Sequence, residues 1–212
     1  MACLAADRNP QEVALLAVSK KHSADKIITF NKLGIRSFGE NQVQEALRKQ
    51  DELKHLDLEW HFIGAIQSNK TGAIAEHFQW VQSVDREKVL LRLASQRSTE
   101  NTPLNVCLQV NIDHEKQKGG AAPDEIMQLA SLCQGLNNIK LRGLMAIPKL
   151  TNDPMEQHDS FRRVRLLFEQ MKSKGFAVDT LSMGMSADLE IAIQEGSTMV
   201  RIGTDLLGKR ES

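Results

Sequence analysis

The chain has 212 residues, and its 27 Lys and Arg residues balance its 27 Asp and Glu residues, so the formal charge is zero. Zero net charge without a basic run argues against a nucleic-acid surface, where clustered cations neutralise phosphates, and no apolar stretch approaches the roughly 18 residues that span a bilayer. The sequence contains no tyrosine, which excludes any mechanism that needs a phenol from this chain.

Short apolar runs rich in Val, Ile and Leu alternate along the chain with longer amphipathic stretches. The amphipathic stretches predict helices, and Gly34, Gly135 and Gly175 stand where helix-terminating glycines are expected. The apolar runs predict eight strands, at residues 15–20, 36–41, 60–66, 80–85, 105–112, 140–148, 180–186 and 199–204.

This alternation predicts an α/β fold, a single (β/α)8 barrel over residues 1–212. A doubly wound open sheet is the alternative, but nothing near the first strand resembles a dinucleotide-binding loop. The three cysteines lie far apart, and residues 1–10 carry Asp7 and Arg8 without an apolar core. We therefore expect reduced thiols and no signal peptide.

In such barrels the functional residues lie at the carboxyl ends of the strands. Lys20 ends the first apolar run, and strand alternation places it on one face with Leu16 and Val18. If that face is the barrel interior, partial burial favours the neutral amine that Schiff-base chemistry requires. A solvated strand-end lysine is the alternative, and Lys21, which points elsewhere, is the natural control.

Two more strand ends carry groups suited to an anion. Gly203 and Thr204 close the last strand and offer backbone N–H groups and a hydroxyl, while Ser186 ends the seventh strand. Ser186 is equally typical of an N-cap residue for a helix from Ala187. In barrels the loops after strands seven and eight commonly form a phosphate site.

The sequence contains neither a complete P-loop nor a zinc-binding motif. Residues 203–209 have the spacing of a P-loop up to Lys209, but Arg210 stands where Ser or Thr would hold magnesium. None of the six histidines forms a zinc-type pair, and no cysteine stands beside one at ligand spacing, so we expect no metal. His61 alone lies on a strand that leads to the barrel mouth, where a packed core histidine is the alternative.

A lysine after the first strand, together with a phosphate site after the last two, is the layout of a pyridoxal-phosphate barrel. The sequence resembles the pyridoxal-phosphate homeostasis proteins (the YggS/PROSC-like family) from about Asp7 to Gly208. The matching segments are LLAVSK (15–20), FGEN (38–41), WHFIG (60–64), QSNK (67–70), RGLMAIP (142–148), LSMGMS (181–186) and MVRIGT (199–204).

The resemblance implies a barrel like the N-terminal domain of alanine racemase and roles for particular residues. It also implies that the N-terminal segment at residues 1–14 is short or truncated, because members of the family usually carry a longer first helix there. Lys20 would hold pyridoxal 5′-phosphate as an aldimine, and Ser186, Gly203 and Thr204 would bind its phosphate. Arg201 resembles the arginine that faces the pyridine nitrogen in related fold-type III enzymes. Asn41 and His61 would line the pocket near the ring.

The resemblance further implies a cytoplasmic monomer that buffers or delivers the cofactor, with apo forms of pyridoxal-phosphate enzymes as partners and without a catalytic role of its own. An amino-acid racemase is the alternative function. Racemisation needs an acid/base group on each face of the substrate carbanion. The relatives that racemise take a tyrosine from a second domain for one face, and this chain has neither.

Overall fold

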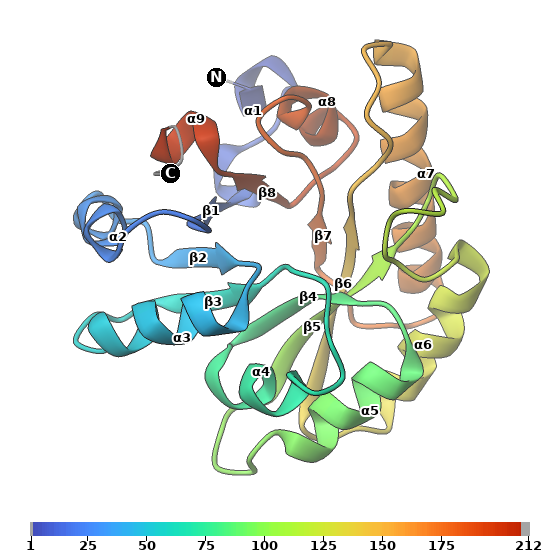
Figure 1. Ribbon diagram of the computed structural model, residues 1–212. Helices are drawn as coiled ribbons and strands as arrows, with labels where there is room; N and C mark the ends of the chain where they lie inside the picture. Colours follow the sequence, from blue (N-terminus) through green and yellow to red (C-terminus); the bar gives the residue numbers. More distant parts are fainter. Residues whose placement is uncertain (1, 209–212) are drawn as a thin grey trace.

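The computed structural model describes residues 2–208 and shows a closed barrel of parallel strands (Figure 1). The strands pair in chain order, and the last pairs with the first through Leu15 opposite Val200 and Leu16 opposite Arg201. Closure confirms the predicted barrel and excludes the open sheet. The strands are β1 (Ala14–Val18), β2 (Ser37–Glu40), β3 (Glu59–Phe62), β4 (Trp80–Val84), β5 (Leu104–Val110), β6 (Ile139–Ala146), β7 (Thr180–Ser182) and β8 (Met199–Ile202).

Helices surround the barrel on its outside, where they bury the outer faces of the strands (Figure 1). Both faces of most strands are therefore covered, and all five residues of β4 are buried, which explains why the strands read as continuous apolar runs. The helices are α1 (Ala2–Ala5), α2 (Ala24–Lys32), α3 (Val43–Glu52), α4 (Thr71–His77), α5 (Glu87–Gln96), α6 (Ile126–Gln134), α7 (Pro154–Ser173), α8 (Leu189–Gln194) and α9 (Thr204–Leu207), with short 3₁₀ turns at Pro10–Glu12 and Pro123–Glu125.

All eight predicted strands are present, but each was predicted too long at its carboxyl end. The largest differences are in β3 and β7, which end at Phe62 and Ser182 rather than at residues 66 and 186. Gly184 has φ +95°, and a Cβ there would lie 2.6 Å from the Cβ of Ala192, so the chain leaves the sheet at that point. The prediction that Ser186 caps a helix from Ala187 is wrong, because α8 begins at Leu189 after Asp188.

The N-terminal segment packs against the end of the chain. The α1 helix contacts α8, and the guanidinium of Arg8 donates to the carbonyl oxygens of Ile193, at 3.1 Å, and of Ser197, at 2.5 Å. The short segment before β1 therefore covers a small apolar cluster that includes Val200 of β8.

The described residues contain neither a candidate membrane-spanning helix nor a candidate metal-binding cluster. None of the helices in residues 2–208 is long and apolar enough to cross a membrane. No cluster of His, Cys, Asp and Glu in the same range could hold a metal ion. The cysteines Cys3, Cys107 and Cys133 are free thiols.

Gly143 gives a test of the barrel geometry. It has φ +146° beside a register shift between β5 and β6, and a Cβ there would lie 2.0 Å from the carbonyl oxygen of Thr180 on β7. We expect Gly143→Ala to lower the free energy of unfolding by about 3 kcal/mol or more, because the strand must move. Denaturant unfolding of the purified variant measures this loss.

Gly34→Ala is the matched control, because Gly34 also has a positive φ, of +93°, but no atom within 4 Å of an added Cβ. Only the backbone strain remains there, so the expected loss is about 1 kcal/mol. Equal losses in the two variants would contradict the packing explanation.

Candidate functional site

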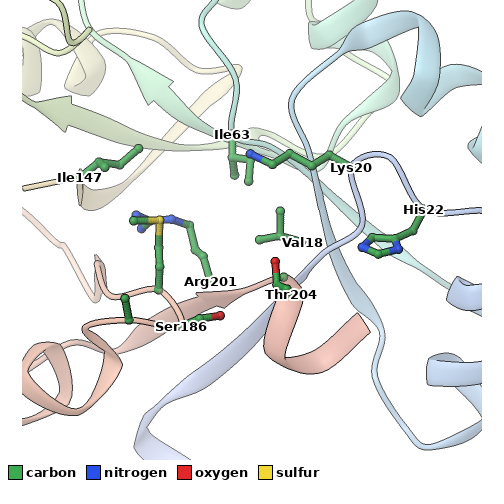
Figure 2. Close-up of a pocket in the computed structure, with 11 residues that line it drawn as sticks. Val18, Lys20, His22, Ile63, Ile147, Ser186, Arg201 and Thr204 are labelled. Carbon is green, nitrogen blue, oxygen red and sulfur yellow. The ribbon is translucent and has the colours of Figure 1, made fainter. Parts of the chain in front are cut away.

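A cavity of about 280 Å³ opens at the carboxyl ends of β1 and β8 (Figure 2). Its volume suits a small molecule, and its walls combine apolar side chains with an amine, a guanidinium and two hydroxyls. The lining residues are Val18, Lys20, His22, Ile63, Ile147, Met185, Ser186, Ala187, Arg201, Gly203 and Thr204.

Lys20 follows β1 and lies on the cavity with Val18, on the interior face that alternation predicts. Figure 2 shows its side chain extended across the cavity toward Ile63, with Ser186 and Thr204 together on the other side. Lys21 has φ +62°, so the chain turns sharply after Lys20 and leaves Lys21 exposed outside the cavity. The two neighbouring lysines therefore differ in what they can reach.

The candidate anion-binding groups come from two loops that follow neighbouring strands. Ser186 lies in the turn between β7 and α8, and Gly203 and Thr204 lie where β8 passes into α9. A Cβ on Gly203 would meet the carbonyl oxygen of Val18 at 3.5 Å, an ordinary contact. The protein atoms alone therefore do not require glycine at this position.

Arg201 forms the floor of the cavity and is only 4% exposed. One guanidinium nitrogen, Nη1, donates to the carbonyl oxygen of Ser182 at 2.7 Å and to its Oγ at 2.8 Å. The other, Nη2, donates to the carbonyl oxygen of Ala146 at 2.9 Å. Burial lowers the pKa of Arg201 to about 10, so the group is still a cation at neutral pH.

A buried chain of hydrogen bonds continues from Arg201 through the barrel interior. The hydroxyl of Ser182 donates to Oε1 of Gln82 at 2.7 Å, and Nε2 of Gln82 donates to Nδ1 of His61 at 2.9 Å. His61 Nε2 in turn bonds to Oε2 of Glu59 at 2.9 Å. We call Glu59, His61, Gln82, Ser182 and Arg201 the interior column.

The column fixes the protonation of His61. Because Nδ1 accepts from the Gln82 amide, the proton of a neutral imidazole lies on Nε2, where it is donated to Glu59. Burial lowers the pKa of His61 below its ordinary value. Hydrogen bonds from His61, followed by Trp80 and Ser37, hold the pKa of Glu59 at about 2, so the carboxylate is ionised at neutral pH.

The structure brings five of the seven candidate residues to the cavity, namely Lys20, Ser186, Arg201, Gly203 and Thr204. His61 does not line it. Its side chain is fully buried lower in the barrel, stacked on Trp80 with 5.0 Å between ring centroids.

Asn41 does not line the cavity either. It lies in a separate surface depression after β2 and β3, together with Gln67 and Lys70. Its backbone supports the loop after β3, because a Cβ on Gly64 would lie 2.3 Å from the Asn41 carbonyl oxygen. Lys209 and Arg210, which figured in the rejected P-loop, lie outside the described residues.

Three other residues that line the cavity, His22, Ile63 and Met185, were not among the candidates selected from the sequence. Ile63 follows β3 directly, so its place at a strand end was the one available signal. Met185 lies in the irregular segment after β7 that was predicted as strand. His22 follows the left-handed Lys21, a turn that the residue types do not predict.

Comparison with known proteins gives concordant matches. Residues 4–211 match the family described as the N-terminal domain of alanine racemase. The pyridoxal phosphate homeostasis protein of Pseudomonas aeruginosa is 54% identical over 210 residues, which cover 99% of this chain and 90% of that protein.

Solved structures agree with the sequence matches. The structure of PipY from Synechococcus elongatus PCC7942 with PLP bound superposes with a TM-score of 0.85 at 37% identity, covering 98% of this chain and 97% of that one. An alanine racemase of Clostridium difficile 630 superposes with a TM-score of 0.78 at 12% identity, covering 96% of this chain and 54% of that one. The second match shows a shared fold.

The interior column predicts a pH dependence of stability. As the pH falls through 6.5, the ordinary pKa of histidine, the unfolded chain binds a proton at His61 that the folded protein does not. The folded state therefore loses stability on acidification. Between about pH 7.5 and about pH 5.5, denaturant unfolding should show roughly 1 kcal/mol more loss in the wild type than in His61→Gln.

Gln is the suitable replacement for His61 because its amide can accept from Gln82 and donate to Glu59 without titrating. All other titrating groups are common to the two proteins, so they cancel in the comparison. If the two proteins lose stability equally over this range, His61 does not have the neutral, buried state described above.

Proposed function

Since the chain belongs to the pyridoxal phosphate homeostasis proteins, a family built on the alanine racemase N-terminal domain, we propose that it binds pyridoxal 5′-phosphate in the cavity at the barrel mouth and holds it there through Lys20. It buffers the cofactor and delivers it to enzymes that need it. One observation carries the proposal, namely that Lys20, Arg201 and the hydroxyls of Ser186 and Thr204 line a single cavity of about 280 Å³.

The donor set fits this cofactor. Pyridoxal phosphate supplies an aldehyde, which condenses with a primary amine and releases water, and it also carries a phosphate and a ring nitrogen. Lys20 is the amine of the cavity. Ser186, Thr204 and the backbone at Gly203 would bind the phosphate, and Figure 2 shows Ser186 and Thr204 across the cavity from the Lys20 amine. Apolar side chains such as Val18 and Ile63 contact the ring.

Arg201 faces the ring nitrogen in this proposal. Its fixed positive charge disfavours a proton on that nitrogen, and a neutral pyridine withdraws electrons weakly. The arrangement suits storage better than carbanion chemistry. The guanidinium of Arg201 donates hydrogen bonds to Ser182 and to the carbonyl oxygen of Ala146, so these protein groups fix its orientation without the cofactor.

Asn41 and His61 then act indirectly. His61 supports Arg201 through Gln82 and Ser182, at the far end of the hydrogen bonds that they share. The backbone of Asn41 packs against Gly64, the residue after Ile63, and Ile63 lines the cavity. Asn41 therefore supports the start of the loop after β3.

We propose a carrier rather than a catalyst. The chain has no tyrosine, so no phenol from this chain can act opposite Lys20 on the second face of a substrate carbanion. The three free cysteines fit a reducing, cytoplasmic location. We take the protein to be a monomer with residues 1–212 forming one cofactor-binding unit, and apo-enzymes to be its partners.

The covalent link is tested on purified protein loaded with pyridoxal phosphate and reduced with borohydride. Peptide mass spectrometry should locate the reduced adduct on Lys20. Lys20→Ala should lose the adduct and the yellow absorbance while unfolding at the same temperature, whereas Lys21→Ala should keep both. An adduct on Lys21, or no adduct, would overturn the proposal.

The carrier role is tested by mixing loaded protein with an apo-enzyme in the presence of a trap that consumes free cofactor. Activity of the acceptor should appear faster than with free cofactor and the same trap, because transfer avoids solution. The loaded protein should also leave the α-hydrogens of amino acids unexchanged. Exchange at enzymatic rates, measured by loss of α-deuterium, would instead favour the racemase alternative.

A further inference from the structure

A buried lysine of α3 lies directly behind the loop that carries Lys20. Lys49 is 6% exposed, and its ammonium donates to three oxygens: the carbonyl of Ser19 at 2.8 Å, Oε1 of Glu40 at 2.7 Å and Oε1 of Glu45 at 2.7 Å. All three ammonium hydrogens therefore have acceptors, and one cation joins β2, α3 and the end of β1. We call Glu40, Glu45 and Lys49 the α3 clamp.

The two carboxylates of the clamp hold the residues on either side of Lys20. The hydroxyl of Ser19 donates to Oε1 of Glu40 at 2.7 Å, and the backbone N–H of Lys21 donates to Oε1 of Glu45 at 2.5 Å. Ser19 is thus held by its side chain and its carbonyl, and Lys21 by its amide. The left-handed conformation of Lys21, with φ +62°, is fixed by the same contact.

The stability of the fold alone does not explain why the α3 clamp consists of buried charged side chains. Removing an ammonium and a carboxylate from water is costly, and well-packed apolar side chains in place of a buried ion pair are often as stable or more so. Glu40 is fully buried, and its Oε2 has no hydrogen-bond partner among the described residues. Burial raises the pKa of Glu40 against the opposing effects of Lys49 and Ser19, so its charge is maintained at a cost.

We propose that Lys49, Glu40 and Glu45 are positioning residues for Lys20. They fix the backbone on both sides of it, so that the amine is presented to the aldehyde in one orientation before the cofactor arrives. This inference rests on the proposed function, in which Lys20 is the attacking amine. Fixing a nucleophile in place accelerates its reaction because less motion has to be lost on the way to bond formation.

The decisive comparison uses Lys49→Met, which keeps the length of the side chain and removes its charge. Arg48→Met is the matched control, because Arg48 is the preceding residue of α3 and is exposed. Two ligands separate positioning from general damage. Pyridoxal phosphate reacts with Lys20, whereas pyridoxamine phosphate has the same ring and phosphate but no aldehyde.

We expect Lys49→Met to slow adduct formation with pyridoxal phosphate by at least about tenfold, measured by borohydride trapping over time. Its affinity for pyridoxamine phosphate should stay within about twofold of the wild type, and Arg48→Met should match the wild type in both. In the ligand-free protein, hydrogen exchange at the Lys21 amide should accelerate in Lys49→Met only. An unchanged rate of adduct formation, or equal loss for both ligands, would overturn the inference.

A second pair of variants keeps the test decisive if Lys49→Met fails to fold. Glu45→Gln retains an oxygen that can accept from the Lys21 amide, and Glu45→Ala does not. Adduct formation should be slow in Glu45→Ala and largely restored in Glu45→Gln, and equal rates in the two would contradict the clamp. Failure of the proposed function is distinguishable, because the wild type itself would then form no adduct at Lys20.

Discussion

The charge of Arg201 inside the barrel is the constraint on which much of this structure depends. A guanidinium in an apolar interior is tolerated only when its hydrogens have acceptors. The acceptors come from the carboxyl ends of β7, which pairs with β8, and of β6, which is the strand on the other side of β7. A layer of the barrel that would otherwise hold branched aliphatic side chains is polar instead. Each of these buried polar groups needs a hydrogen-bond partner, so the series continues from Ser182 to Gln82 and then to His61. It ends at Glu59, which is partly exposed to solvent at the amino end of β3.

The fold could be predicted from sequence because parallel strands covered on both faces leave a clear pattern. The strand ends could not, because the apolar pattern and the inter-strand hydrogen bonds both continue just beyond β3 and β7. Ile63 still donates to the carbonyl oxygen of Glu40 and Met183 to that of Met199, so the pattern alone does not show where each strand ends. Lys20 could be selected because it interrupts an apolar run at a strand end. Thr204 could be selected because it lies at the end of the last strand, where phosphate sites of barrels occur.

Two other parts of the site had no readable signal. Gln82 and Ser182 are hydrogen-bonded across a separation of 100 residues, and each looks like an ordinary polar interruption of its own strand. Lys49 lies in a helix whose charged residues are mostly exposed, so periodicity predicts a solvated side chain. Its burial depends on Glu40 and Ser19, which belong to other elements, and only the three-dimensional structure shows them together.

The pairing of β8 with β1 determines when the cavity is complete. Lys20 follows the first strand and Thr204 follows the eighth, and the pairing of these two strands brings both residues to one cavity. A nascent chain that lacks β8 has the amine but neither the guanidinium nor the second hydroxyl. Under the function proposed above, the chain captures the cofactor only after β8 has paired with β1, and copies that lack β8 do not draw on the pool of free cofactor.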